Sequence, residues 1–228
     1  ENNWSVKSLI REIVLSRTYL LSSDLVEANA NLDPNNRLLW RMNHKRLNAE
    51  SLRDAMLATS GRLNREPPVG SPITQLGDVN VGRAMRQLNQ RQRGSNQRSV
   101  YLPILRNSLP EMMRVFDAAE PSLIVGKRNE TTVPTQALYF MNDPFFHRCA
   151  EKFAERVLRA GADPGSQLDF ACRELFARPV RDEEVVAFRE FAEVLRSTIK
   201  GDQKVVEQEL WKAYARVLLG SNELLHID

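Results

Sequence analysis

The sequence predicts a mostly α-helical protein built from packed antiparallel helices. Apolar residues recur at helical spacing along most of the chain, helix start and stop residues flank these stretches, and the later stretches are joined by short links. The 228 residues can bury a sizeable core, and 42% hydrophobic with 27% charged residues is typical of a folded domain. We therefore expect residues 1–228 to form a single helical domain, as a fragment of a longer protein.

The N-terminal part contains two expected helical stretches. Apolar residues at helical spacing predict a first helix around residues 9–14. Asp33-Pro34 predicts the start of a second stretch, with Asp as N-cap and Pro at the first helical position, and Gly61 ends it. The pattern leaves open whether this stretch is one helix or two helices broken near Asn43.

The middle of the chain is predicted to be irregular. Residues 62–98 are rich in Gly, Pro and Arg and lack sustained periodicity, which indicates a long loop that is either functional or mobile. Residues 99–106 form a β-like run, and Pro103 confines it to an edge or a short extended segment. We expect this segment to run extended across or between helices.

Six further helices are predicted in the C-terminal half. The first follows Ser108 and Glu111, which form a capping box. The others are expected over residues 134–140, 142–161, 166–175, 182–201 and 206–218.

Several kinds of protein are excluded by composition. No apolar run approaches the roughly 20 residues of a membrane span, and the N-terminus has no signal-peptide pattern. Two cysteines exclude a dense disulfide scaffold and a four-cysteine zinc site, and three isolated histidines indicate no metal centre. Neither a glycine-rich phosphate loop nor a nucleophile elbow is present. The residues therefore give little support to an enzyme.

The two cysteines are predicted to remain separate. If their helices form a hairpin, Cys149 and Cys172 are offset by roughly 7–8 Å along the helix axis, beyond normal disulfide reach. This favours two buried thiols. No Cys-x-x-Cys-His motif occurs, so we expect no cofactor, and no covalently attached haem, in this chain.

The basic charge is concentrated in one segment. Residues 65–110 carry seven basic and two acidic side chains, whereas residues 111–228 carry sixteen basic and twenty acidic ones. Six arginines follow Val79 without an acid or a lysine among them: Arg83, Arg86, Arg91, Arg93, Arg98 and Arg106. They are either solvated or paired with the acidic C-terminal half, or they bind a polyanion such as a sulfated glycan or an acidic protein. Nucleic acid is disfavoured, because Tyr101 is the one aromatic residue available for base stacking there.

Two carboxylates are weak catalytic candidates. Asp54 follows Arg53 on an expected helix, and Asp117 follows Phe116 near a helix end. Two converging carboxylates could share acid and base work on a glycosidic bond. An Asp beside an Arg is far more often a structural ion pair, and the sequence does not show that the two converge.

Three stretches carry a family resemblance. They are Trp4-Ser5-Val6-Lys7 through Tyr19; Asp33-Pro34-Asn35-Asn36-Arg37-Leu38-Leu39-Trp40-Arg41 through Ser60-Gly61; and Arg98-Ser99-Val100-Tyr101-Leu102 through Thr131-Thr132-Val133-Pro134-Thr135-Gln136-Ala137-Leu138. The chain resembles the C-terminal part of the planctomycete-type domain of unknown function 1553, the PSD-one domain. The resemblance implies an exported, extracytoplasmic parent protein with an upstream domain of unknown function 1549 and, often, a cytochrome c-like haem domain. It supplies no reaction and no catalytic residue.

The family pattern marks a set of polar residues in helical surroundings. They are Asn36, Arg37, Arg53, Asp54, Arg98, Tyr101, Arg106, Asp117, Arg128, Thr131, Thr132 and Gln136. We interpret them first as a buried network that joins the helices to the extended segment, and second as a cleft for an anionic group.

Two functions from different classes follow. The leading hypothesis is a non-catalytic interaction module that docks upstream domains of its own polypeptide, an acidic protein surface or an acidic polysaccharide. Its ligand-binding candidates are Arg53, Arg83, Arg86, Arg91, Arg93, Arg98, Tyr101, Arg106 and Arg128. The alternative is a hydrolase of polysaccharide breakdown that uses Asp54 and Asp117, which requires the two carboxylates to face one cleft within roughly 5–10 Å.

Overall fold

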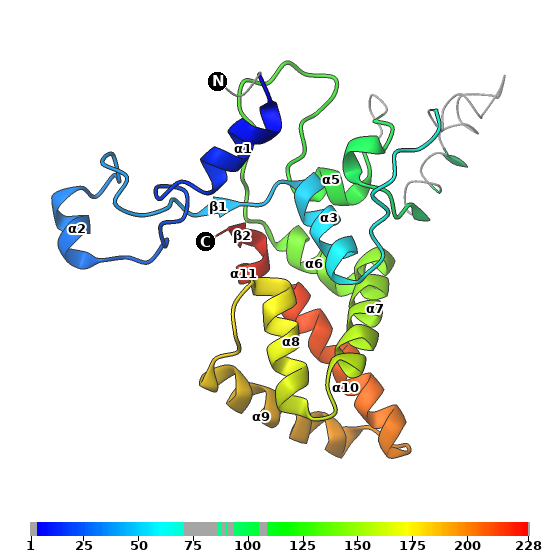
Figure 1. The fold of residues 1–228 in the computed structure, drawn as a ribbon. Coiled ribbons are helices and arrows are strands. Elements are labelled where there is room, and N and C mark those ends of the chain that lie inside the picture. The colour runs from blue at the N-terminus through cyan, green and yellow to red at the C-terminus, as the bar shows by residue number, and fades with distance from the viewer. Residues whose placement is uncertain (1–3, 71–85, 88–89, 91–93, 105–108, 228) are drawn as a thin grey trace. The chain divides into compact units, whose positions relative to one another are not determined.

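The structure is a computed structural model, and it describes residues 4–70, 86–87, 90, 94–104 and 109–227. The predicted fold class is confirmed: the chain is mostly helical, with one small antiparallel sheet (Figure 1). Its internal contacts divide it into two compact units. Unit 1 contains Glu1–Arg46 and His226–Asp228, and unit 2 contains Leu47–Leu225. None of the described helices combines the length and the apolar character that a membrane span requires.

Unit 1 is small and lacks an apolar core. It contains helices α1 (Val6–Val14) and α2 (Glu27–Leu32) and strands β1 (Lys45–Arg46) and β2 (His226–Ile227), which pair antiparallel. Within its described residues no large apolar side chain is buried, whereas three polar residues, Ser23, Asp33 and Asn36, are. Unit 1 is therefore held together by hydrogen bonds rather than by apolar packing.

The prediction of a helical stretch that starts at Asp33 is wrong for the first half of that stretch. Residues 33–43 form a hydrogen-bonded loop, in which the Asp33 carboxylate accepts from the Leu38 amide at 2.7 Å. The Asn36 side chain donates to Arg41 O at 2.8 Å and accepts from the Arg41 amide at 3.3 Å. Short polar side chains of this kind compete with helical backbone hydrogen bonds, so they stabilise the turns instead.

Unit 2 holds the remaining helices of the described chain. They are α3 (Ala49–Thr59), the 3₁₀ turn η2 (Ser99–Tyr101), α5 (Glu111–Val115), α6 (Pro134–Asn142), α7 (Pro144–Ala160), α8 (Pro164–Phe176), α9 (Asp182–Thr198), α10 (Gln203–Leu219) and α11 (Asn222–Leu225). Four of them begin behind a side chain that accepts from the first turn, namely Asn48, Asp143, Asp163 and Asp202. Such caps satisfy amides that the helix itself leaves without partners.

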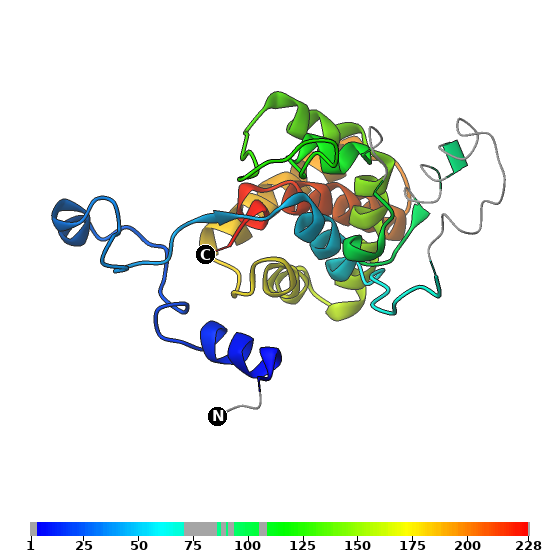
Figure 2. The same ribbon diagram turned by 90° about the horizontal axis from the view of Figure 1, so that it is seen from above.

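The core of unit 2 lies around α7 and α10, which run side by side in Figures 1 and 2. Phe153 of α7 and Trp211 of α10 are almost completely buried. The Trp211 indole stacks on Phe188 of α9 at 4.8 Å between ring centroids and donates to Gln167 of α8 at 2.8 Å. These contacts join three helices, α8, α9 and α10, around one indole.

The segment predicted to run extended begins as a helical turn. Ser99–Tyr101 form η2, and the backbone becomes extended at Leu102. The turn follows from Asp54, which draws the Ser99 amide and hydroxyl onto α3. In the predicted loop over 62–98, Asn64 and Gln97 form an isolated parallel bridge, and residues 86, 87, 90 and 94 are helical. Residues 71–85, 88–89, 91–93 and 105–108 lie outside the described part of the chain.

Candidate functional site

Arg53 and Asp54 join α3 to the segment before η2. The buried Arg53 guanidinium donates to Ser95 O at 2.6 Å, to Gln97 O at 2.9 Å and to Ser99 Oγ at 3.2 Å. Asp54 Oδ1 accepts from the Ser99 amide at 2.8 Å and from its hydroxyl at 2.7 Å. Burial lowers the pKa of Arg53, and the negative charge of Asp54 opposes that shift. These side chains act as structural connectors.

Asp117 makes a similar connection elsewhere in unit 2. Its carboxylate accepts from the Thr131 amide at 2.8 Å and from the Thr131 hydroxyl at 2.9 Å, while its backbone adopts a positive φ of 60°. Gln136 donates to Thr131 O and Val115 O, both at 3.0 Å. Asp54 and Asp117 thus both bind backbone amides, and neither lines the three cavities described below.

The arginines proposed as an anion site are only partly described. Arg83, Arg91, Arg93 and Arg106 lie outside the described residues. Arg86 is exposed, and Arg98 places its Nε 3.8 Å from Asp54 Oδ2. Arg128 forms a two-pronged ion pair with Glu50, at 2.7 and 3.0 Å, and these hydrogen bonds raise its pKa. Tyr101 is half-buried within η2.

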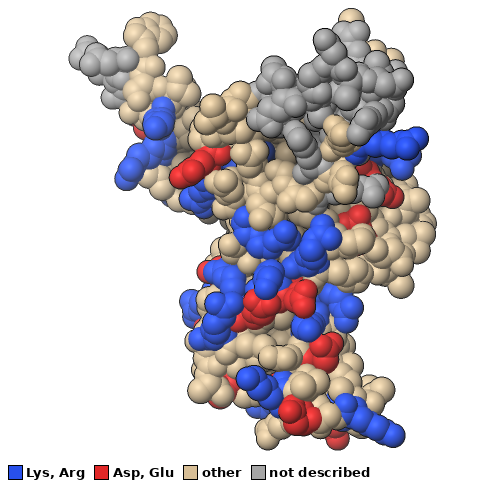
Figure 3. Space-filling view, turned by 90° about the vertical axis from the view of Figure 1, so that its right-hand side faces the viewer, with Lys and Arg blue, Asp and Glu red and all other residues tan. Residues whose placement is uncertain are grey.

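The face in Figure 3 shows how cations are distributed on one side of the molecule. Lys and Arg side chains gather in the middle of this view, with Asp and Glu side chains among them. Two ion pairs of unit 2, Lys152–Glu155 and Arg156–Glu174, have nitrogen–oxygen distances of 2.7 Å. Among the described residues, the basic side chains gathered in this view are therefore interrupted by acidic ones.

The largest of the three cavities is an apolar groove on unit 2. We call it the α6–α10 groove; its volume is about 530 Å³. It is lined by Thr132, Val133, Gln136, Ala137, Phe140, Met141, Phe146, His147, Arg216, Val217, Gly220, Asn222 and Leu225. The lining contains a cation and no carboxylate, and Val133, Met141 and Val217 are exposed within it.

Two polar groups stand out in the α6–α10 groove. The exposed Arg216 guanidinium makes no hydrogen bond or ion pair with any residue in the described ranges. His147 donates from Nε2 to Met141 O at 2.9 Å. The groove can therefore bind an apolar side chain beside a carboxylate.

A polar cleft lies where α5, α6 and α7 meet. An outer cavity of about 390 Å³ and an inner one of about 50 Å³ share the lining residues Glu111, Tyr139 and Asp143. Burial and the neighbouring Asp143 carboxylate raise the pKa of Tyr139 well above its ordinary value. Asp143 also accepts from the Phe145 amide at 2.7 Å as the cap of α7. The cleft has the size and polarity to hold water or a small polar molecule.

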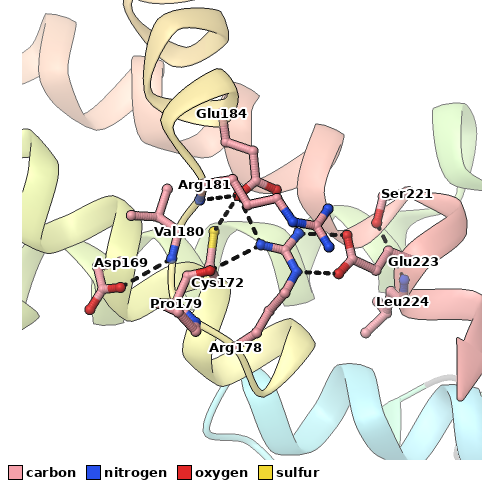
Figure 4. Close-up of polar contacts among 10 residues, drawn as sticks. All are labelled: Asp169, Cys172, Arg178, Pro179, Val180, Arg181, Glu184, Ser221, Glu223 and Leu224. Atoms are coloured by element: carbon pink, nitrogen blue, oxygen red, sulfur yellow. Dashed lines mark hydrogen bonds and ion pairs between the residues drawn. The ribbon is translucent and has the colours of Figure 1, made fainter. Parts of the chain in front are cut away.

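A charged cluster surrounds Arg178, after the end of α8 (Figure 4). Its guanidinium binds Glu184 through two hydrogen bonds, at 2.6 and 2.9 Å, and Glu223 through two more, at 2.6 and 2.7 Å. These bonds raise the pKa of Arg178 and lower that of Glu184 to about 2. Cys172 points into the same cluster, and its Sγ lies 3.8 Å from Glu184 Oε2.

The cysteine prediction is confirmed. Cys149 and Cys172 are both free and buried. Burial raises the pKa of both thiols, that of Cys172 to about 12 with the neighbouring Glu184 charge contributing. Neither thiol is suited to act as a nucleophile near neutral pH. Within the described residues, no group of three or more His, Cys, Asp and Glu side chains could hold a metal ion.

Comparison of the sequence with known protein families shows which family the chain belongs to. A family model described as "PSD1: Protein of unknown function (DUF1553)" matches residues 1–192. The chain belongs to the DUF1553 family. No curated protein and no solved structure matches this DUF1553 chain. The matched range includes α6 and α7 of the groove, whereas α10 and α11 follow it.

Sequence reasoning missed the α6–α10 groove, the polar cleft and the Arg178 cluster in this DUF1553 chain. Asp143 lies at the start of the helix predicted over residues 142–161, and Arg216 is an isolated cation on a predicted helix. One available signal was the pair Gln136 and Phe140 at helical spacing, which places a polar and an apolar group on the same face of α6.

Proposed function

We propose that this chain is a non-catalytic interaction module whose α6–α10 groove docks an acidic, apolar segment of a partner protein. The observation that carries this proposal is Arg216, which has no partner among the described residues, beside an apolar lining that holds no carboxylate. An apolar groove with a few polar groups at its rim is typical of sites that bind a side-chain anchor and orient it through charge.

The chemistry of the lining selects the occupant. Phe140, Met141 and Val217 offer apolar contact to a Leu-, Phe- or Trp-sized side chain. Arg216 favours a carboxylate next to that side chain, since a guanidinium binds carboxylates in a two-pronged geometry. A segment with Asp or Glu beside a large apolar residue satisfies both requirements, whereas a neutral or basic segment leaves the cation unpaired.

The proposal is tested by selecting ligands from a phage-displayed library of short random peptides. We expect enrichment of peptides that place Asp or Glu next to a large apolar residue. The affinity of a selected peptide, measured by fluorescence polarisation, should fall about ten-fold or more in Val217→Asp and in Arg216→Glu.

The matched controls lie on α9, away from the groove lining. Val186 is 52% exposed against 54% for Val217, and Arg189 is exposed like Arg216. Val186→Asp and Arg189→Glu should bind the selected peptide like the parent chain. Equal binding by Val217→Asp, or no enrichment of acidic–apolar peptides, would overturn the proposal. Binding of polygalacturonate in place of any peptide would favour an anionic polymer instead.

The proposed setting is an exported, multidomain bacterial protein with a haem-bearing domain upstream. The resemblance described above supports this setting, in which the docked segment belongs either to the same polypeptide or to another protein. The proposed docking uses side chains alone and needs no cofactor in this chain.

A further inference from the structure

Unit 1 exposes apolar side chains in two separate places. The first is α1, whose apolar residues Val6, Leu9, Ile10 and Ile13 are each at least 50% exposed. The second is the leucine tip, which we define as Leu32, Leu38 and Leu39 around the loop of residues 33–43. Because unit 1 buries no large apolar side chain in its described residues, these groups do not serve a core.

The apolar residues of α1 form one stripe. Val6, Leu9, Ile10 and Ile13 recur at spacings of three and four residues, and helical residues at these spacings share a face. Lys7, Arg11 and Glu12 lie off this stripe, so the cations outnumber the single carboxylate of the helix. An amphipathic helix with cations beside an exposed apolar face is typical of segments that lie in a membrane surface.

The leucine tip is held in place by polar bonds. Leu38 is 82% exposed, although its amide is bound to the buried Asp33 carboxylate at 2.7 Å. Leu39 is 53% exposed and has a φ of 53°, a left-handed conformation that a leucine adopts only at an energetic cost. The loop therefore holds two leucines in solvent in a strained backbone, and such strain is concentrated at functional positions.

The charge of the surrounding segment indicates what these leucines contact. Residues 34–46 contain Arg37, Arg41, Lys45 and Arg46 and no acidic residue. Trp40 lies between these cations and is half-buried, with its Nε1 donating to Asp33 O at 3.0 Å. The carboxylate of this loop, Asp33, is buried. Aliphatic tips, a tryptophan and cations without an exposed carboxylate among residues 33–46 match the layers of an anionic membrane surface.

We propose that unit 1 binds the surface of an anionic lipid bilayer, with the stripe of α1 and the leucine tip inserted among the headgroups. A bilayer accepts separate aliphatic groups without shape complementarity, whereas a protein partner would have to match both sites at once. Two anchors together also give the firmer attachment that one short apolar group does not. The proposal concerns unit 1 alone and is independent of the α6–α10 groove.

The test is co-sedimentation of the full chain with phosphatidylcholine vesicles, with and without phosphatidylglycerol. We expect binding to the anionic vesicles, weakened by salt and by loss of either anchor. Leu38→Asn with Leu39→Asn should lower the partition coefficient about ten-fold or more, because two inserted leucines are lost. Asn adopts a positive φ readily, so the variant keeps the loop backbone. Ile10→Asn with Ile13→Asn tests α1 separately.

Controls separate loss of contact from loss of fold. Leu123→Asn removes an exposed leucine from unit 2 and should leave binding unchanged. The Trp40 indole resonance should stay in place in the tip variant, because its bond to Asp33 O is retained. Three results would each overturn the proposal: no sedimentation with anionic vesicles, equal binding to neutral and anionic vesicles, or parental binding by both anchor variants.

Discussion

Replacing Arg178 with methionine should destabilise unit 2 more than the loss of an ordinary surface ion pair. The arginine neutralises Glu184 and Glu223 at once, through four hydrogen bonds of 2.6–2.9 Å. Methionine is of similar length but removes the guanidinium, which lies over the Phe176 ring, and leaves the two carboxylates facing each other beside the buried Cys172.

The expected loss of stability follows from how exposed the three charged side chains are. The side chains of Arg178, Glu184 and Glu223 are 18%, 23% and 30% exposed. They lie between exposed pairs, which contribute about 0–1 kcal/mol, and buried pairs, whose disruption costs about 3–5 kcal/mol. We expect Arg178→Met to lower the free energy of unfolding by about 2–3 kcal/mol near pH 7.

The loss should depend on pH. The folded-state pKa of Glu184 is about 2 against an ordinary value of 4.5, so its ion pair contributes fully above about pH 4.5 and is lost as the pH falls towards 2. Arg178→Met has no such contribution to lose. The gap in stability between parent and variant should therefore be widest near neutral pH and should narrow on acidification.

Urea unfolding monitored by far-UV circular dichroism at several pH values measures this gap. Arg196→Met is the matched control, because Arg196 binds Glu207 at 2.6 Å while its own side chain is 43% exposed. The control should cost less than about 1 kcal/mol. A loss for Arg178→Met no larger than that of the control, or a gap that widens at low pH, would refute the reasoning.

Three other perturbations have defined outcomes. Asp54→Ala removes two hydrogen bonds to Ser99 and should lower the free energy of unfolding by about 2 kcal/mol, measured in urea. Trp211→Phe leaves the buried Gln167 amide oxygen without its indole donor, and the free energy of unfolding should fall by about 2–3 kcal/mol in the same assay. The Cys172 thiol, with its pKa raised to about 12, should react with iodoacetamide at pH 8 only once urea unfolds the chain, whereas fast labelling of the folded chain would contradict its burial.

The sequence predicted the elements whose signals are local. Asp143-Pro144 marks the start of α7, and Gly161 follows its end, because capping and backbone freedom act over a few residues. The helix predicted to start at Asp33 failed for an equally local reason, since the side chains of Asp33 and Asn36 bind loop amides instead of starting a helix. A local pattern thus predicts a helix start reliably only where the side chain has one favourable set of hydrogen bonds. At Asp33 and Asn36, bonds to loop amides compete with helix capping.

The candidate site could not be predicted in the same way. Arg53 is a cation on an expected helix, and its partners Ser95 and Gln97 lie more than forty residues further along the chain. The α6–α10 groove brings Val133 and Val217 to one lining, which helix packing decides and periodicity does not. A cation such as Arg216 becomes informative only when the structure shows that no residue of the described chain pairs with it.

The small sheet of unit 1 determines the order in which the two units complete their folding during synthesis. A ribosome releases β1 long before β2, and the whole of unit 2 emerges between these two strands. Closing so long a loop is opposed by entropy that grows with the logarithm of its length. Folding of unit 2 removes most of that cost, because it brings the Leu47 amide within 2.8 Å of Leu225 O, next to both strands. The newborn chain is thus expected to finish unit 1 last, with unit 2 as the template that positions β2.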